Sequence, residues 1–511
     1  MALNPSESHP VRHHLPRFGP DTDFAALRSL LAQCGFTAAR ICQRLQIPGI
    51  GSYLDLRQGR EVVRSAEDAL DALILLLMDG EYVERAALDR LLPPGALALM
   101  ESLGVTAFEP DRPELCYGAL TLFPVEGLLL ANDRASAPDN TPFVLAPDAV
   151  YPAATANTLQ FLEAMPRSPC DSHLDIGTGT GVAALAAARF ARHVWGTDIA
   201  ARSALFAEFN RRLNGIGNAT VLEGDLYQPV EGLTFDCIVT HPPYVPAREN
   251  KMVFRDGGED GEQILRGIVE GLPRFLRPGG RFFAMATAAD CEGEAFEERL
   301  RRWLGPAEAE FDLALASYTL TAPSDLAATA LAKRSTPVEE ILYRQDLWKR
   351  RQVRLLFYGV VTLARHSAPR AAFTVRVQTG EGFTPRHIDW LLEWGAEAHD
   401  PARRQAILDL RPTLSPHAEL AVFHRVQEGR FVPEALSLRA RSPFDAECVI
   451  QPWLAQVVSG CNGETTWRQH FERVRRAGAF EDGAEPEEFV SVLEPLVSNG
   501  LLWLPERPLP A

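Results

Sequence analysis

The spacing of hydrophobic positions changes along the chain, and its first part has the period of helices. Apolar residues recur at helical spacing from Asp23 to about Leu103, and Pro93-Pro94-Gly95 interrupts the pattern. We therefore expect a loose arm over residues 1–20 and a compact, winged-helix-like helical domain over residues 21–115. Because this region is not strongly basic, packing or protein contact is the expected role, and not DNA recognition.

The pattern then changes to strands that alternate with helices. Strands are predicted at 119–123, 128–132, 173–176, 193–196, 220–222, 235–240, 281–285, 311–317 and 353–363. Helices are predicted at 153–165, 182–190, 262–275 and 292–304. This alternation is typical of a parallel α/β sheet, so we expect an α/β domain over residues 116–365.

The C-terminal region, residues 371–511, mixes strands and helices in an α+β pattern. Helices are predicted at 385–397, 453–458, 465–475 and 485–498, before a short apolar segment at 501–504. The order of the later elements resembles small winged-helix modules. A cap that packs onto the α/β domain is an equally good interpretation.

Charge and cysteine usage narrow the possible partners. The chain has 511 residues and a formal net charge of −16, which disfavours a surface that binds nucleic acid mainly through phosphates. The eight cysteines form no C-x-x-C pair, so reduced core thiols are expected and no metal site. His9, His13 and His14 have no ligand set around them. Without an apolar run near ~18 residues or a signal-peptide core at 1–14, we expect a cytoplasmic protein with no membrane contact.

The chemistry-bearing residues lie where four predicted strands end. The first strand runs into Gly177-Thr178-Gly179-Thr180-Gly181, and Asp198 follows the second strand, 21 residues after Gly177. The third is followed by Gly224-Asp225-Leu226 and the fourth by His241-Pro242-Pro243-Tyr244. A carboxylate at Asp175, beside the glycine turn, would repel a pyrophosphate and suits a ligand with an ammonium group.

Together these residues resemble the class I S-adenosylmethionine-dependent methyltransferases, and more narrowly the small-domain group that includes the release-factor glutamine methyltransferases. The resemblance is strong over about residues 145–300, and residues 254–261 are similar to the glycine-rich segment that follows the Pro-Pro motif in that group. It implies a Rossmann-like, seven-stranded, mostly parallel methyltransferase sheet. This sheet would stand between the N-terminal helical domain and the C-terminal α+β extension.

The resemblance also implies S-adenosyl-L-methionine as the cofactor. Asp175 would face its ammonium group, Asp198 its ribose hydroxyls and Asp225 its adenine amino group. The full predicted cofactor set is Asp175, Gly177, Thr178, Gly179, Gly181, Asp198, Ile199, Asp225 and Leu226, with Ile199 and Leu226 against the adenine ring and Asp148 and Tyr151 as lid residues.

The predicted catalytic residues are His241, Pro242, Pro243 and Tyr244. In the resembled group the fourth strand ends in Asn-Pro-Pro-Tyr, and those enzymes methylate planar nitrogens of glutamine amides or nucleic-acid bases. His241 stands where that Asn is expected. Either His241 replaces it as hydrogen-bond acceptor or base, or the methyl acceptor is another nitrogen or an oxygen, or catalysis has been lost. Retention of both prolines and Tyr244 argues against loss.

We therefore expect N-methylation of a planar nitrogen in a protein or peptide, because a small metabolite would not need two further domains. One rival is an RNA or DNA base N-methyltransferase that acts on an extruded base. The other is a non-catalytic S-adenosylmethionine-binding interaction protein. The charge around the pocket distinguishes nucleic acid from protein, and the oligomeric state stays open.

Overall fold

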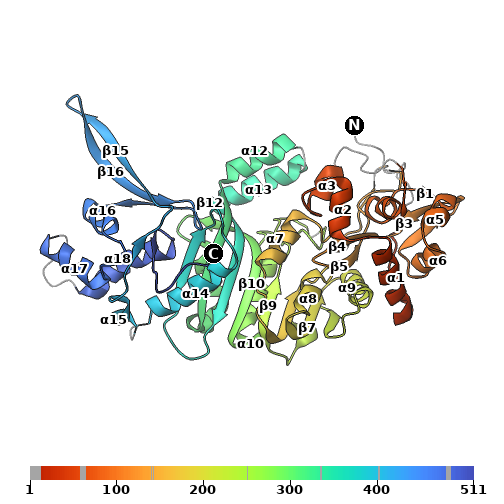
Figure 1. Ribbon diagram of the computed structural model, residues 1–511, viewed down its shortest axis with the longest axis horizontal. Coiled ribbons are helices and arrows are strands. Elements are labelled where there is room, and N and C mark those ends of the chain that lie inside the picture. Colours follow the sequence, from red (N-terminus) through yellow and green to blue (C-terminus); the bar gives the residue numbers. More distant parts are fainter. Residues whose placement is uncertain are drawn as a thin grey trace. The chain divides into compact units, whose positions relative to one another are not determined.

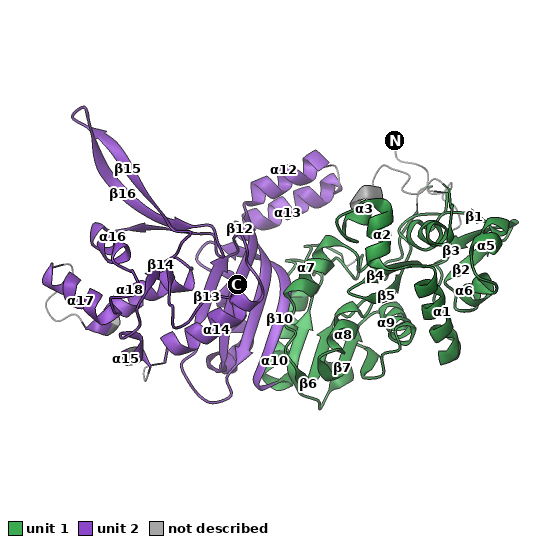
Figure 2. Cartoon of the chain, viewed as in Figure 1, with its two compact units in different colours: residues 1–276 green, residues 277–511 purple. Residues whose placement is uncertain are grey.

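The computed structural model describes residues 13–57, 65–139, 141, 143–249, 251–333, 336–400, 403–478 and 485–510. The chain folds as two compact units, residues 1–276 and residues 277–511 (Figure 2). Of the predicted loose arm, residues 1–12 with His9 lie outside the described residues. The described remainder is tied down, because the N–H of Arg17 donates to the carbonyl of Leu103 over 2.9 Å.

The N-terminal region of unit 1 contains helices and also a small antiparallel sheet. The helices are α1 (Asp21–Gln33), α2 (Ala38–Leu45), α3 (Ser52–Arg57), α4 (Ala69–Leu73), the π-helical turn Ile74–Asp79, α5 (Arg85–Leu91) and α6 (Ala96–Ser102). The strands β1 (Val83–Glu84), β2 (Thr106–Glu109) and β3 (Arg112–Gly118) stand in the order β1-β3-β2. The sequence did not predict them because β1 is very short and β3 begins with the polar residues Arg112, Pro113 and Glu114.

The predicted hairpin between residues 119 and 132 is confirmed. Strands β4 (Thr121–Val125) and β5 (Leu128–Asn132) pair antiparallel around Glu126 and Gly127, whose φ angles are 53° and 73°. Positive φ at both central residues is typical of the two-residue turns that join twisted strands. Asn210 links this hairpin to the glycine turn, because its Nδ2 donates to the carbonyls of Ala131 and Thr180, each over 2.9 Å.

The strands that carry the predicted site lie side by side in unit 1. They are β6 (Cys170–Ile176), β7 (Ala191–Asp198), β8 (Ala219–Glu223) and β9 (Phe235–Thr240), all parallel and in the order β9-β6-β7-β8. Ile176 pairs with Thr197 on one side and with Thr240 on the other, so the carboxyl ends of these strands are level. This register brings the turns after each strand to one edge of the sheet.

Helices complete this part of unit 1. They are α7 (Ala156–Ala164), α8 (Val182–Ala187), α9 (Ala201–Leu213), the 3₁₀ turn Gln228–Val230 and α10 (Gln263–Phe275). Every residue of α8 is buried, which explains its run of small alanines between close neighbours. The helix is three residues shorter than the predicted 182–190, because Ala188 to Phe190 form a tight turn into β7.

Unit 2 contains the remaining predicted strands of the α/β domain. They are β10 (Leu276–Cys291), β11 (Phe311–Thr321) and β12 (Val353–Arg365), with β12 antiparallel to both others. The helices α11 (Phe296–Leu304), α12 (Pro323–Lys333) and α13 (Val338–Arg350) connect them. A further strand, β13 (Thr374–Gln378), lies parallel to β11, although the sequence placed it in the C-terminal extension. The α/β prediction is thus confirmed in its coarse form.

The C-terminal α+β region follows within unit 2. Its elements are α14 (Arg386–Ala398), α15 (Arg404–Ile407), β14 (Thr413–Leu414), β15 (Glu419–Gln427), β16 (Arg430–Ala440), β17 (Ala446–Ile450), α16 (Pro452–Ser459), α17 (Trp467–Arg476), α18 (Pro486–Ser498) and β18 (Leu502–Trp503). The predicted helices at 385–397, 453–458, 465–475 and 485–498 are confirmed. The long hairpin of β15 and β16, visible in Figure 1, was not predicted as such. No helix of the described residues is long and apolar enough to cross a membrane.

Candidate active site

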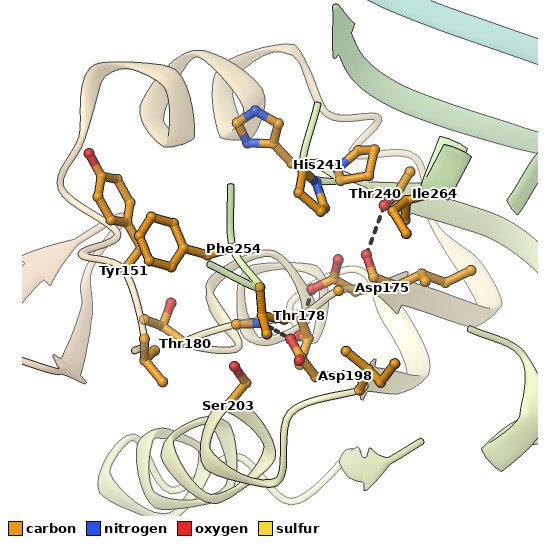
Figure 3. A pocket seen from close by; sticks show the side chains of 18 of the residues that line it. Tyr151, Asp175, Thr178, Thr180, Asp198, Ser203, Thr240, His241, Phe254 and Ile264 are labelled. Carbon is orange, nitrogen blue, oxygen red and sulfur yellow. Dashed lines mark hydrogen bonds between the residues drawn. The ribbon is translucent and has the colours of Figure 1, made fainter. Parts of the chain in front are cut away.

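A cavity of about 620 Å³ opens at the carboxyl ends of β6, β7, β8 and β9 (Figure 3). All thirteen residues of the predicted site lie in the described part of the chain, and twelve of them line this cavity: Asp175, Gly177, Thr178, Gly179, Asp198, Ile199, Asp225, Leu226, His241, Pro242, Pro243 and Tyr244. The predicted lid residues Asp148 and Tyr151 line it too. The structure therefore brings together residues that are up to 96 positions apart, from Asp148 to Tyr244.

Gly181 is the predicted site residue that does not line the cavity. Its φ is 82°, and a β-carbon added there would stand 3.1 Å from the Cβ of Ala207 on α9. Glycine at this position therefore allows α8 to begin close against α9.

The other two glycines of the turn have a different environment. Gly177 and Gly179 have φ angles of 73° and 54°, and an added β-carbon would meet nothing within 4 Å at either position. The open space that they face is the cavity, which both residues line. Their missing side chains leave the backbone accessible from the cavity.

Asp175 is a buried carboxylate at the end of β6. Its Oδ2 accepts hydrogen bonds from Thr178 Oγ1 at 2.7 Å and from the N–H of Ala184 at 3.1 Å. Its Oδ1 has no hydrogen-bond partner among the described residues. Burial, with a smaller contribution from the nearby carboxylate of Asp198, raises the pKa of Asp175 to about 6. A cation placed at Oδ1 would compensate for both effects.

Asp198, at the end of β7, joins two loops through its carboxylate. Its Oδ2 accepts the N–H of Gly179 and its Oδ1 accepts the N–H of Ala200, each over 2.9 Å, and Ser203 also bonds to it. Burial raises the pKa of Asp198 despite these bonds. A carboxylate has about four acceptor positions, so capacity remains for ligand hydroxyl groups.

The third strand end forms an exposed apolar and acidic corner of the cavity. Leu226 has a φ of 46°, and its carbonyl accepts a hydrogen bond from Thr197 Oγ1 at 3.1 Å. Asp225 is exposed, and its backbone carbonyl, not its carboxylate, accepts the N–H of Gln228. Ile199 is 60% exposed, so a bound ring would cover apolar surface that is otherwise in water.

The His-Pro-Pro-Tyr segment follows directly on β9. Thr240 Oγ1 donates to the carbonyl of Ile176 over 2.8 Å, which fixes the end of β9 against β6. The His241 ring lies 5.3 Å from the Phe161 ring and 6.0 Å from the Tyr244 ring, nearly parallel to the latter at 24°. Desolvation lowers the pKa of His241 to about 4, so the imidazole is neutral near pH 7.

The glycine-rich segment after the motif packs directly against it. The N–H of Gly257 donates to the carbonyl of Val245 over 2.9 Å, and the N–H of Val245 donates to the carbonyl of Arg255 over 3.0 Å. A β-carbon on Gly257 would stand 2.6 Å from the Pro243 carbonyl oxygen, so only glycine allows this approach.

The same segment contributes a ring to the cavity. Phe254 stacks on Tyr151, with ring centroids 5.1 Å apart and planes 19° apart (Figure 3). The N–H of Val253 also donates to the carbonyl of Pro147 over 2.9 Å. The predicted lid segment around Asp148 and Tyr151 is thereby joined to the segment that follows the motif.

Several lining residues were not predicted as site residues. Asn157 and Phe161 come from α7, Thr180 from the glycine turn, Ser203 from α9 and Phe254 from the glycine-rich segment. Asn157 Nδ2 donates to Tyr244 Oη over 3.0 Å. No local pattern marks Asn157 or Phe161, because each contacts a residue about 80 or more positions later in the chain. No group of three His, Cys, Asp or Glu side chains suited to a metal ion occurs in the part of the chain that the structure describes.

The part of the chain that lines most of this cavity is similar to known proteins. Residues 153–305 match the family model of the methyltransferase small domain. The release factor glutamine methyltransferase of Moorella thermoacetica is 32% identical over 176 residues, which are 32% of this chain and 60% of that protein. The ribosomal protein uL3 glutamine methyltransferase of Bradyrhizobium diazoefficiens is 34% identical over 152 residues, 27% of this chain and 47% of that protein.

A solved structure of a ribosomal protein L11 methylase from Lactobacillus delbrueckii subsp. bulgaricus is 19% identical, with a TM-score of 0.24, over 41% of this chain and 77% of that one. This structural likeness is too low to inform function. The chain spans only 47–60% of the length of the two curated relatives above. Over residues 153–305 the chain is nevertheless similar to the methyltransferase small domain, and it resembles the release factor glutamine methyltransferases there.

Proposed function

We propose that the protein is an S-adenosyl-L-methionine-dependent methyltransferase that modifies a planar nitrogen of a protein or peptide. The observation that carries this proposal is a cavity that joins the glycine turn, Asp198 and the His-Pro-Pro-Tyr segment. The family match over residues 153–305 supports the reaction class. The glutamine methyltransferases among the relatives support a side-chain amide as the acceptor.

The residues of the cavity fit the cofactor. Gly177 and Gly179 leave the backbone open to it, and the free Oδ1 of Asp175 suits its ammonium group. Asp198 retains acceptor positions for the ribose hydroxyls, and Ile199 offers apolar surface to the adenine. When bound, this cofactor supplies an electrophilic methyl group on a sulfonium cation.

The neutral state of His241 suits a cavity that binds a cation. A protonated imidazole would repel the sulfonium, and the low pKa of His241 prevents protonation near pH 7. The neutral ring accepts one N–H bond through its bare nitrogen. A conjugate acid with a pKa of about 4 makes a weak base, so we favour the hydrogen-bond acceptor over the general base among the roles considered for His241.

Tyr244 and Pro242 complete the proposed acceptor slot. The Tyr244 ring offers a face on which a planar amide stacks, and the carbonyl of Pro242 takes the second N–H. Holding both N–H bonds fixes the nitrogen lone pair in one direction. It also stabilises the positive charge that develops on nitrogen during transfer.

The charge of the cavity favours a protein substrate over a nucleic acid. Among its described lining residues, the carboxylates Asp148, Asp175, Asp198, Asp225 and Asp256 outnumber the single cation, Arg255. A nucleic-acid phosphate would be repelled by such a lining, as by the net charge of −16. A translation protein such as a release factor or ribosomal protein is the proposed acceptor, which would place the enzyme in the cytoplasm.

The flanking regions are proposed to present this substrate. The order α4, β1, α5, α6, β2, β3 with sheet order β1-β3-β2 supports a winged-helix-like N-terminal module. The order α16, α17, α18, β18 supports a related module near the C-terminus. A non-catalytic binding protein is the remaining alternative.

One experiment separates these possibilities. The purified protein is incubated with methyl-labelled S-adenosyl-L-methionine and a lysate from a strain that lacks it, and the lysate is then fractionated into protein, RNA and DNA. We expect label in a protein, at glutamine. Label in RNA or DNA would show instead that the substrate is a nucleic-acid base and not a protein. Cofactor binding without any transfer would support the non-catalytic alternative.

A further inference from the structure

Helix α7 brings two side chains to the His-Pro-Pro-Tyr segment. Asn157 Nδ2 donates to Tyr244 Oη over 3.0 Å, and the Phe161 ring lies 5.3 Å from the His241 ring. Residues four apart lie on one face of a helix, so a single face of α7 contacts both ends of the segment. Both side chains line the cavity.

The Asn157 side chain has no role in starting the helix. Thr155 is the N-cap of α7 and makes no side-chain capping bond, and the Asn157 amide bonds to Tyr244 and not to the backbone of α7. Its Oδ1 has no hydrogen-bond partner among the described residues, although the residue lines the cavity. The Asn157 amide is thus held in place through Nδ2, and its Oδ1 remains available to accept a hydrogen bond from a ligand.

The neighbouring acceptor has a limitation that Asn157 does not share. A neutral imidazole has one bare nitrogen, and which one it is depends on the tautomer. An amide oxygen has two lone pairs in every state and does not titrate. The Asn157 side-chain oxygen can therefore accept a hydrogen bond in the slot whichever tautomer His241 adopts.

We propose that Asn157 holds Tyr244 through Nδ2, and that its Oδ1 shares with the His241 ring the N–H of the methyl acceptor that the Pro242 carbonyl does not take. This inference rests on the proposed methyltransferase function and narrows its substrate class. An amide oxygen favours a group that carries N–H bonds, such as a primary carboxamide. It disfavours a carboxylate or a ring nitrogen that carries no hydrogen. Such an atom and the Asn157 oxygen are both hydrogen-bond acceptors, and no proton would lie between them.

The test uses two replacements at one position. Asn157→Leu keeps the shape and removes both polar atoms, whereas Asn157→Asp keeps an acceptor oxygen and lets the Tyr244 hydroxyl donate to it. Glu163→Ala, on an exposed position of the same helix outside the cavity lining, is the matched control. The probes are tritiated-methyl S-adenosyl-L-methionine and a purified, unmethylated release factor. Calorimetry measures the affinity for the cofactor separately.

We expect Asn157→Leu to lower kcat at least about tenfold while the cofactor Kd changes less than about twofold. Asn157→Asp should stay within about threefold of the wild-type kcat, and Glu163→Ala should equal the wild type. The inference would be overturned if Asn157→Leu kept the wild-type kcat, or if Asn157→Asp were as impaired as Asn157→Leu. Neither result would affect the proposed methyltransferase function. A wild-type protein that transfers no methyl group would overturn the proposed function and the inference with it.

Discussion

The backbone N–H of Gly179 donates to the Asp198 carboxylate over 2.9 Å, and this bond ties the turn after β6 to the end of β7. The glycine turn and the acid are therefore parts of one rigid edge, although 19 positions separate them. Ligand groups that bind at Asp198 necessarily lie beside the open backbone of the turn.

Replacement of Gly177 should weaken cofactor binding because the new side chain enters the cavity. Gly177→Ala places a methyl group where nothing lies within 4 Å and adds the strain of a φ of 73°, roughly 1 kcal/mol. Gly293→Ala is a matched control, because it has a φ of 76° and equally open surroundings outside the cavity. Thermal denaturation should show similar losses of stability for both. Calorimetry should show weakened cofactor binding for Gly177→Ala only, and equal binding by the two variants would contradict this role.

Cofactor affinity should depend on pH through Asp175. Its pKa in the free protein is raised to about 6, and a cationic ligand binds the ionised form. Affinity should therefore be constant above pH ~7 and fall about tenfold per pH unit below pH ~6. Calorimetry from pH 5 to 8 would measure this slope. Asp175→Asn should bind weakly with a much flatter profile, and a profile unchanged by this substitution would assign the slope to another group, such as Asp198.

His241→Ala should abolish methyl transfer and leave cofactor affinity nearly intact, because His241 belongs to the acceptor slot and not to the cofactor contacts. Since burial lowers the pKa of His241 to about 4, the pH profile of kcat should show no step between pH 6 and 7 from this residue. Rate measurements from pH 5 to 8 would check both points. Unchanged turnover in His241→Ala would remove the residue from the mechanism.

Gly257→Ala should damage the acceptor slot without reaching the cofactor. The added β-carbon would stand 2.6 Å from the Pro243 carbonyl oxygen and 2.9 Å from the Tyr244 Cα, so the segment must shift. Displacement by about 1 Å is enough to lower a rate on the order of 100-fold. Gly217→Ala, with nothing within 4 Å, serves as the control in the same kcat and Kd measurements. Normal kcat in Gly257→Ala would show that the contact of the glycine-rich segment with the His-Pro-Pro-Tyr segment does not determine the geometry of the acceptor slot.

Sequence patterns predicted the strand ends because their signals are local. The glycine turn, Asp198 and the His-Pro-Pro-Tyr segment each follow directly on a predicted strand, and parallel register then places them together. Gly181 belongs to the same pattern, but its environment depends on Ala207, which the pattern does not contain.

The missed residues depend on tertiary contacts. Asn157 bonds to Tyr244, which lies 87 positions later in the chain, and Phe254 stacks on Tyr151. Hydrophobic periodicity reports on neighbours within one helix or strand, so it predicts neither contact. Strands β1 and β3 escaped prediction because they are short or polar and gain their stability from pairing with each other.

Calorimetric titration with S-adenosyl-L-methionine tests the central claim most directly, in the wild type and in Asp198→Ala. We predict saturable binding near one equivalent in the wild type, and at least about tenfold weaker binding when the Asp198 carboxylate and its charge-assisted bonds are removed. Absence of binding in the wild type, or equal affinity in the variant, would contradict the assignment of this cavity to the cofactor.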